Sequence, residues 1–165
     1  MAPFAVIATS DASGCADATP RGDAPGFVAV VDDRTLLMPD RTGTNRVDTM
    51  LNIIENPHVG LLFMVPGMVE TLRVNGRATI TIDGALLEAL AVGGKPPRAA
   101  IRVDIEEVYF QCGKALIRSE LWNVKNHVPR DTFPPFGQIF SEHSKVDYDP
   151  GIEEILDEEY RSGLY

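Results

Sequence analysis

A strict two-residue alternation of apolar and polar positions over residues 71–82 is the clearest pattern in the chain. The apolar or small positions are Leu72, Val74, Gly76, Ala78, Ile80 and Ile82, and the polar positions are Thr71, Arg73, Asn75, Arg77, Thr79 and Thr81. Successive side chains of a strand point to opposite faces. This pattern therefore predicts a long strand with one buried face and one solvent-exposed face.

Shorter apolar runs predict strands at residues 4–9, 27–31, 36–38 and 59–65, and alternating segments predict strands at 15–21 and 101–110. The residues from Asp11 to Gly14 predict a hairpin turn between the strands at 4–9 and 15–21. The segment 59–65 is nearly all apolar, which is typical of a strand buried on both faces. In the last strand the alternation slips by one residue at Glu106-Glu107, and such a slip indicates a β-bulge.

A helix is predicted before residue 59 by four apolar residues that recur at the spacing of one helical face: Val47, Met50, Leu51 and Ile54. Asn45 can cap its start, and Asn56-Pro57 ends it. Further helices are predicted at residues 85–92, capped by Asp83, at 114–122 and at 152–159. Together these elements predict a mainly β fold, an antiparallel barrel of six or seven strands with a few short helices.

Composition narrows the classes of protein. The net charge is −9, with acidic residues crowded between 147 and 159, so we expect no nucleic-acid binding, which needs clustered Lys and Arg. No apolar stretch approaches the roughly 20 residues of a membrane helix. The first residues lack the features of a signal peptide, and Cys15 and Cys112 are expected to be reduced, buried thiols, which together favour the cytoplasm. We expect a barrel domain over residues 1–130 and an acidic extension over 131–165 that packs on the barrel or on a second subunit.

Several kinds of catalytic site are disfavoured by the absence of their motifs. His58, His127 and His143 do not have the spacing of metal ligands relative to one another or to the cysteines. The sequence contains no Gly-x-Ser-x-Gly motif, no phosphate-binding P-loop and no dinucleotide-binding fingerprint. Hydrolase and nucleoside-triphosphatase functions are therefore weakly supported.

The segment Pro39-Asp40-Arg41-Thr42-Gly43-Thr44-Asn45-Arg46 is a candidate anion site. It follows a predicted strand and leads into a predicted helix, where exposed backbone amides favour anions. Its two guanidinium groups suit a phosphate monoester. A capped helix with surface arginines explains the same residues equally well.

Four motifs in this order resemble the FMN-binding split-barrel proteins related to pyridoxamine 5′-phosphate oxidase. They are Ala-Thr-Pro-Arg-Gly-Asp at 18–23, Met-Pro-Asp-Arg-Thr-Gly-Thr-Asn-Arg at 38–46, Leu-x-x-Ile-x-x-Asn-Pro-x-Val-Gly-Leu-Leu-Phe, with small changes of spacing, over 51–63, and Glu-Thr-Leu-Arg-Val-Asn-Gly-Arg-Ala at 70–78. The resemblance covers residues 4 to about 122. Residues 112–122, Cys-x-Lys-Ala-Leu-x-Arg-Ser-x-Leu-Trp, are similar to a bacterial subgroup of FMN-dependent enzymes.

The resemblance implies a split β-barrel with FMN bound between two subunits of a homodimer. Contacts to the ribityl chain and the polar edge of the flavin are implied for Arg21, Gly22 and Asp23. Contacts to the phosphate are implied for Arg41, Thr44, Asn45 and Arg46. Pro39 and Asp40 would pass the ring with their backbone. Thr71 stands where the family often has a glutamine that reaches the flavin from the long strand, and Arg73 stands on the same face. The partner's contact to the ring is implied for Trp122, and the mouth of the site for Lys114 and Arg118.

The implied function is that of an FMN-dependent oxidoreductase with an unidentified substrate and electron donor, and no general acid can be named. Arg73 or Arg21 would stabilise the reduced, anionic flavin. The segment after Trp122 lacks the Arg and His motif with which pyridoxamine phosphate oxidases grip their substrate, so that activity is disfavoured. A non-catalytic protein that binds or carries flavin or a deazaflavin is the alternative. Haem is disfavoured because no histidine falls in the segments expected at the groove.

Overall fold

The computed structural model describes residues 1–43 and 47–164, which divide into two compact units, Met1–Trp122 and Asn123–Tyr165. The predicted boundary between residues 130 and 131, and the packing expected for the extension, stay predictions. The strands of the first unit are β1 (Phe4–Ser10), β2 (Ala16–Gly22), β3 (Ala29–Asp32), β4 (Thr35–Pro39), β5 (His58–Met64), β6 (Thr71–Thr81) and β7 (Ala100–Gln111).

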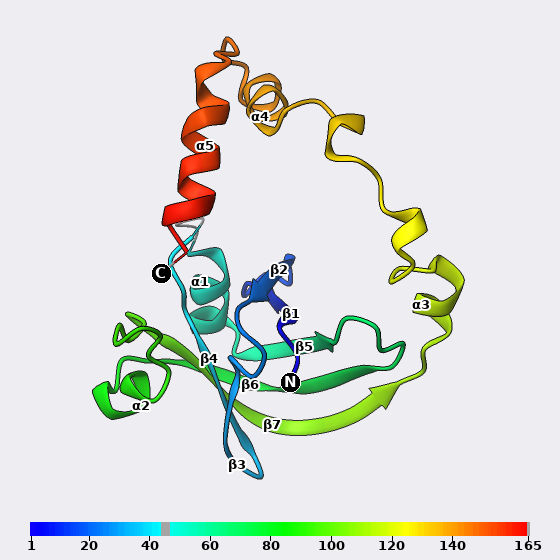
Figure 1. The fold of residues 1–165 in the computed structure, drawn as a ribbon. Coiled ribbons are helices and arrows are strands. Elements are labelled where there is room, and N and C mark those ends of the chain that lie inside the picture. The colour runs from blue at the N-terminus through cyan, green and yellow to red at the C-terminus, as the bar shows by residue number, and fades with distance from the viewer. Residues whose placement is uncertain (44–46, 165) are drawn as a thin grey trace. The chain divides into compact units, whose positions relative to one another are not determined.

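These strands form one antiparallel, seven-stranded sheet in the order β2-β1-β5-β6-β7-β4-β3. The described strands β2 and β3 are its two edges, and β6 and β7 lie side by side as its longest strands (Figure 1). This sheet with a few short helices confirms the predicted mainly β fold and its strand number.

The alternation predicted for β6 is largely confirmed. Val74 and Ala78 are buried in the main core, whereas Arg73 and Arg77 are exposed. The exception on the polar face is Thr71, which is only 5% exposed. Core positions on the other strands repeat the same alternation, and they include Ala5, Ile7, Leu36, Met38, Val59, Leu61, Ile101 and Val103. The strand β5 is not buried on both faces as expected, since His58 is exposed and every second position is only half-buried.

The β-bulge predicted in β7 is confirmed. Asn75 of β6 pairs with Glu107, but the next residue, Gly76, pairs with Ile105, so Glu106 is the extra residue. A Cβ atom at Gly76 would overlap the carbonyl oxygen of Asp104. Only glycine therefore allows the two strands to approach this closely at the bulge.

The helix α1 (Asp48–Glu55) is held on the sheet by hydroxyl and amide groups. Thr49 Oγ1 lies 3.1 Å from Thr19 Oγ1 of β2, and Asn52 Nδ2 donates to Thr9 Oγ1 of β1 at 3.0 Å. Thr9 and Thr49 are both buried, and buried hydroxyl groups need hydrogen-bond partners. The face of α1 that meets the sheet is therefore partly polar.

The apolar face predicted for α1 points mostly to solvent. Val47, Leu51 and Ile54 are 53%, 53% and 72% exposed, whereas Ile53 is buried. The helix itself is confirmed and ends before Asn56, but its apolar residues are not those that face the core. The predicted cap, Asn45, lies outside the described residues.

The remaining helices of the first unit are short. In α2 (Gly84–Glu88) the predicted cap is confirmed, because Asp83 accepts hydrogen bonds from the backbone of Ala85 and Leu86 at 3.0 and 3.1 Å. The helix α3 (Lys114–Ser119) ends earlier than predicted. Cys15 and Cys112 are free and exposed, so the expectation of buried thiols is wrong.

All regular elements among the described residues of the second unit are helices: η1 (Val124–Asn126), η2 (Arg130–Thr132), α4 (Phe136–Ser144) and α5 (Gly151–Ser162). Gly137 of α4 donates its backbone N–H to Glu153 Oε1 of α5 at 2.9 Å. None of the buried hydrophobic residues of the described chain belongs to this unit. No helix within residues 1–43 and 47–164 combines the length and the apolar character needed to cross a membrane.

Candidate functional site

Four of the predicted site residues meet where β2 and β4 end. Arg21 Nη1 lies 3.4 Å from Asp40 Oδ1, and Arg41 Nε lies 2.6 Å from Asp23 Oδ2. β2 and β4 are not neighbours in the sheet, so these ion pairs join two strands that share no backbone ladder. We call Arg21, Asp23, Asp40 and Arg41 the charged cluster.

Backbone hydrogen bonds position the carboxylates of the charged cluster. The N–H of Asp23 donates to the carbonyl of Pro3 at 3.1 Å, just beyond the last residue of β2. The N–H of Asp40 donates to the carbonyl of Ala99 at 3.0 Å, which continues the pairing of β4 with β7. Backbone hydrogen bonds therefore fix the main chain at both aspartates of the cluster.

The charged cluster is largely removed from solvent. The side chains of Asp23 and Arg41 are 2% and 17% exposed, and those of Arg21 and Asp40 are 18% and 30% exposed. Burial raises the pKa of the Asp40 carboxyl above its ordinary value, and the positive charge of Arg21 partly opposes this rise. Two guanidinium groups face two carboxylates, so the formal charge of the cluster is balanced.

Arg21 has one donor that is not used. Its Nε is buried and has no hydrogen-bond partner among the described residues. An unsatisfied buried donor costs roughly 1–3 kcal/mol, and for a charged group the cost is higher. A ligand rich in acceptor oxygens or nitrogens would satisfy this donor, so the residues present fit the polar edge of a flavin.

Two other predicted site residues lie at the ends of the same two strands. Gly22 is exposed at the end of β2, and Pro39 is buried at the end of β4. The predicted phosphate contacts Thr44, Asn45 and Arg46 lie outside the described residues. Their assignment stays a prediction.

A second group of predicted residues lies on and beyond β6. The group consists of Thr71, Arg73, Lys114, Arg118 and Trp122. Trp122 Nε1 donates to the carbonyl of Met68 at 2.7 Å, which fixes the indole against the turn between β5 and β6. The guanidinium of Arg73 lies 5.4 Å from the centre of the Tyr109 ring, a cation–π contact. Lys114 and Arg118 are exposed on α3.

Within one chain the structure does not bring this second group to the charged cluster. Arg21 pairs with Ala5, Ala5 pairs with Phe63, and Phe63 pairs with Leu72 across the sheet. Arg73 follows Leu72 in β6, so its side chain points to the opposite face from that of Arg21. Arg21 and Arg73 therefore lie on opposite faces of the sheet.

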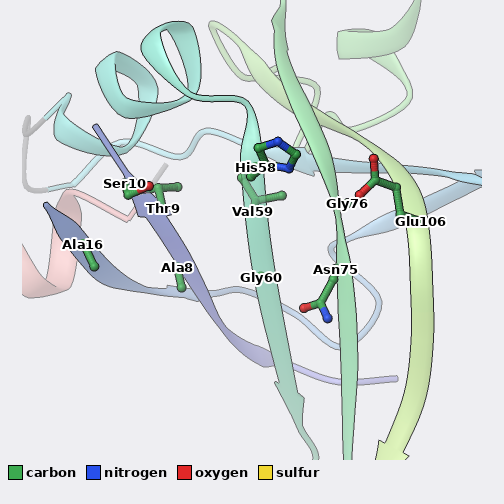
Figure 2. Close-up of a pocket in the computed structure, with 10 residues that line it drawn as sticks. All are labelled: Ala8, Thr9, Ser10, Ala16, His58, Val59, Gly60, Asn75, Gly76 and Glu106. Carbon is green, nitrogen blue, oxygen red and sulfur yellow. The ribbon is translucent and has the colours of Figure 1, made fainter. Parts of the chain in front are cut away.

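A pocket that the sequence did not indicate lies on the outward face of the sheet (Figure 2). Its volume is about 340 Å³, and its lining residues are Ala8, Thr9, Ser10, Ala16, His58, Val59, Gly60, Asn75, Gly76 and Glu106. From the sequence, His58 was considered only as a metal ligand and was therefore not placed at this pocket. The usable signal was the bulge at Glu106 beside small residues on neighbouring strands. In the described part of the chain, no three His, Cys, Asp or Glu residues are placed to hold a metal ion.

Comparisons with known proteins agree with this fold. The family model described as Pyridoxamine 5′-phosphate oxidase matches residues 1–112. A search of the curated proteins finds no match. The crystal structure of HupZ from Group A Streptococcus is 24% identical, covers 67% of this chain and 86% of its own, and has a TM-score of 0.53.

General Stress Protein 26 from Bacillus anthracis is 16% identical over 67% of this chain and 84% of its own, with a TM-score of 0.50. An F420 reductase is 21% identical over 66% of this chain and 90% of its own, with a TM-score of 0.48. The structures of HupZ and General Stress Protein 26 support the same fold at low identity, and the family model covers well over half of the sequence. The protein therefore belongs to the pyridoxamine 5′-phosphate oxidase family.

Proposed function

We propose that this protein is an FMN-dependent oxidoreductase that works as a homodimer and binds FMN at the charged cluster. The observation that carries the proposal is the buried Nε of Arg21, a cationic donor with no acceptor among the described residues. Membership of the pyridoxamine 5′-phosphate oxidase family supports it, because the motifs of the resemblance include both arginines of the cluster.

Each residue of the cluster has a distinct part in this proposal. Arg21 donates to the polar edge of the flavin and places a positive charge where negative charge develops on reduction. Asp23 holds the guanidinium of Arg41 through the 2.6 Å ion pair, so that Arg41 is oriented in advance. Asp40 holds Arg21 in the same way. When bound, FMN would supply hydride transfer, and the protein would supply position and charge.

The phosphate of FMN needs a cation that the charged cluster does not have to spare. Asp23 and Asp40 already balance the two arginines. We therefore assign the phosphate to Arg46 together with Thr44 and Asn45, as the resemblance implies, with Arg41 at the border between phosphate and ribityl chain.

The homodimer is supported by two features of the Met1–Trp122 unit. The predicted site residues lie on two faces of one sheet, so a single site that uses both groups needs two copies of the chain. In addition, Val108 and Phe110 occupy core-side positions of β7, opposite Val74 and Leu72, yet they are 56% and 75% exposed. A second subunit related by two-fold symmetry would cover this apolar surface and bring its own Trp122 to the site.

Measurements of FMN binding test the proposed cofactor and the proposed role of Arg21. The protein is purified and its bound chromophore released and identified, and the apoprotein is then titrated with FMN. Arg21→Gln removes a charge-assisted donor, worth roughly 1.5–3 kcal/mol, so affinity should fall by about one to two decades. Arg34→Gln is the matched control, because Arg34 is an exposed arginine in the turn between β3 and β4. Equal affinity of both variants and the wild type would remove Arg21 from the site.

The phosphate assignment is tested by comparing FMN with riboflavin. Arg46→Ala should weaken FMN by about one to two decades, the size of a charge-assisted contact, and leave riboflavin binding unchanged. An equal loss for both ligands would contradict a phosphate contact.

Reduction of the bound flavin tests the enzyme proposal. NADH, NADPH or an organic donor should bleach the visible flavin band without oxygen, and air should restore it. If no donor bleaches it, the protein is a flavin carrier or sensor instead. If FMN does not bind but a deazaflavin does, the same arginines serve a different cofactor. The proposed homodimer predicts twice the chain mass by analytical ultracentrifugation.

A further inference from the structure

The pocket on the outward face of the sheet presents an amide oxygen to its floor. Asn75 Nδ2 donates to Glu107 Oε2 at 2.7 Å, which fixes the orientation of the amide. A Cβ atom at Gly60 would stand 3.5 Å from Asn75 Oδ1, so this oxygen lies over the space that glycine leaves open. Among the described residues no group donates a hydrogen bond to Asn75 Oδ1.

The bulge in β7 adds a carboxylate to the same pocket. Glu106 is the residue without a partner in β6, and its side chain extends from β7 toward Gly76 (Figure 2). Glu106 is exposed and forms no ion pair within residues 1–43 and 47–164. With Glu107 beside Asn75, two carboxylates and one amide oxygen face this part of the sheet.

Arg73, Arg77 and Asp104 are charged residues on the same face, and each contacts another side chain. Arg77 Nη1 donates to His58 Nε2 at 3.2 Å, because a guanidinium can only donate. Asp104 pairs with Arg102 at 3.2 Å. Among the residues that line the pocket, Glu106 carries a full negative charge, and none is a lysine or an arginine.

The floor of the pocket is apolar. Ala8, Gly60 and Ala16 lie on neighbouring strands and carry a methyl group or no side chain. About 340 Å³ of space lies above them, which is at the lower end of the range of ligand pockets. Fewer than three His, Cys, Asp or Glu side chains converge here within the described residues.

We propose that this pocket binds a small organic ammonium ion, with the charged nitrogen between Glu106 and Asn75 Oδ1 and the apolar body over Ala8 and Gly60. A carboxylate and a carbonyl oxygen are the acceptors that a protonated primary amine needs. The site lies on the face of the sheet opposite to Arg21, the face on which Arg73 also lies. None of the four residues it uses, Ala8, Gly60, Asn75 and Glu106, is assigned to the flavin.

Binding of benzylammonium to the full-length protein tests the proposal, with benzyl alcohol as the uncharged probe of the same shape. Two-dimensional NMR should show shifts confined to the residues around the pocket and tighter binding of the ammonium ion than of the alcohol. Glu106→Gln should weaken benzylammonium by about twofold to fivefold, the size of an exposed ion pair. The control is Glu88→Gln, an exposed glutamate on α2, which should leave the affinity unchanged.

Ala8→Leu should abolish benzylammonium binding by filling the floor of the pocket while leaving the far-UV circular dichroism spectrum unchanged. Retained binding in a folded Ala8→Leu protein would place the ligand elsewhere and overturn the proposal. So would equal binding of the alcohol, equal effects of the two glutamate variants, or no binding at all.

Discussion

Replacing Gly76 with alanine tests whether the bulge depends on the close approach of two backbones. The added Cβ would overlap the carbonyl oxygen of Asp104 and stand 3.1 Å from its carbonyl carbon and 3.3 Å from the Cα of Ile105. All three atoms belong to the backbone of β7, so no side chain can rotate away. Overpacking lowers the free energy of unfolding by roughly 1–3 kcal/mol. Because the atoms met here are backbone atoms that cannot rotate away, we expect a loss at the upper end, about 3 kcal/mol.

Thermal unfolding measures this loss. For a domain of this size 1 kcal/mol shifts Tm by about 2–4 °C, so Gly76→Ala should lower Tm by roughly 6–12 °C. The matched control is Gly60→Ala on the neighbouring strand, whose Cβ would meet only Asn75 Oδ1, at an ordinary 3.5 Å. We expect this control to stay within about 0.5 kcal/mol of the wild type. Equal melting temperatures for the two variants would refute the reasoning.

Three further predictions concern the charged cluster and the helix beside it. Asp23→Asn leaves the mostly buried Arg41 without its carboxylate and should cost about 3 kcal/mol in a urea unfolding experiment. The raised pKa of Asp40 means that ionisation of this carboxyl opposes folding, so stability should fall as pH rises from below 3.8 through the higher pKa of the folded state. Asp40→Asn should reduce this fall, measured as Tm against pH, although the variant also removes the ion-pair partner of Arg21. Leu51→Ser should change the unfolding free energy by less than about 0.5 kcal/mol, because Leu51 is 53% exposed, and a larger loss would mean that another surface covers it.

The sheet could be predicted because its side chains follow the simplest periodicity. Alternation over residues 71–82 defined β6, and the slip at Glu106-Glu107 located the bulge to within two residues. Both signals are local, since a strand's pattern depends only on which of its faces is buried. The family resemblance added four motifs between residues 18 and 78, all within the residues 1–112 that the family model matches.

The orientation of α1 could not be predicted because it depends on a partner distant in sequence. Leu51 and Ile54 suggested an apolar face, but Thr9 of β1 and Thr19 of β2 place hydroxyl groups beneath the helix. Turning Thr49 inward satisfies these groups, and the apolar residues then face outward. The predicted helix is correct, whereas its buried face required knowledge of the sheet.

The charged cluster shows how far residue type alone can mislead about charge. From the sequence, Arg41 was a cation of the candidate phosphate site and Arg21 a contact to the ribityl chain and flavin edge, but the fold gives each of them a carboxylate, Asp23 and Asp40. A balanced cluster can orient a ligand through directed donors, yet it supplies no net positive charge. Under the proposed function the charge that attracts FMN must therefore come chiefly from Arg46. Salt should then weaken FMN binding much more than riboflavin binding, and this difference should disappear in Arg46→Ala.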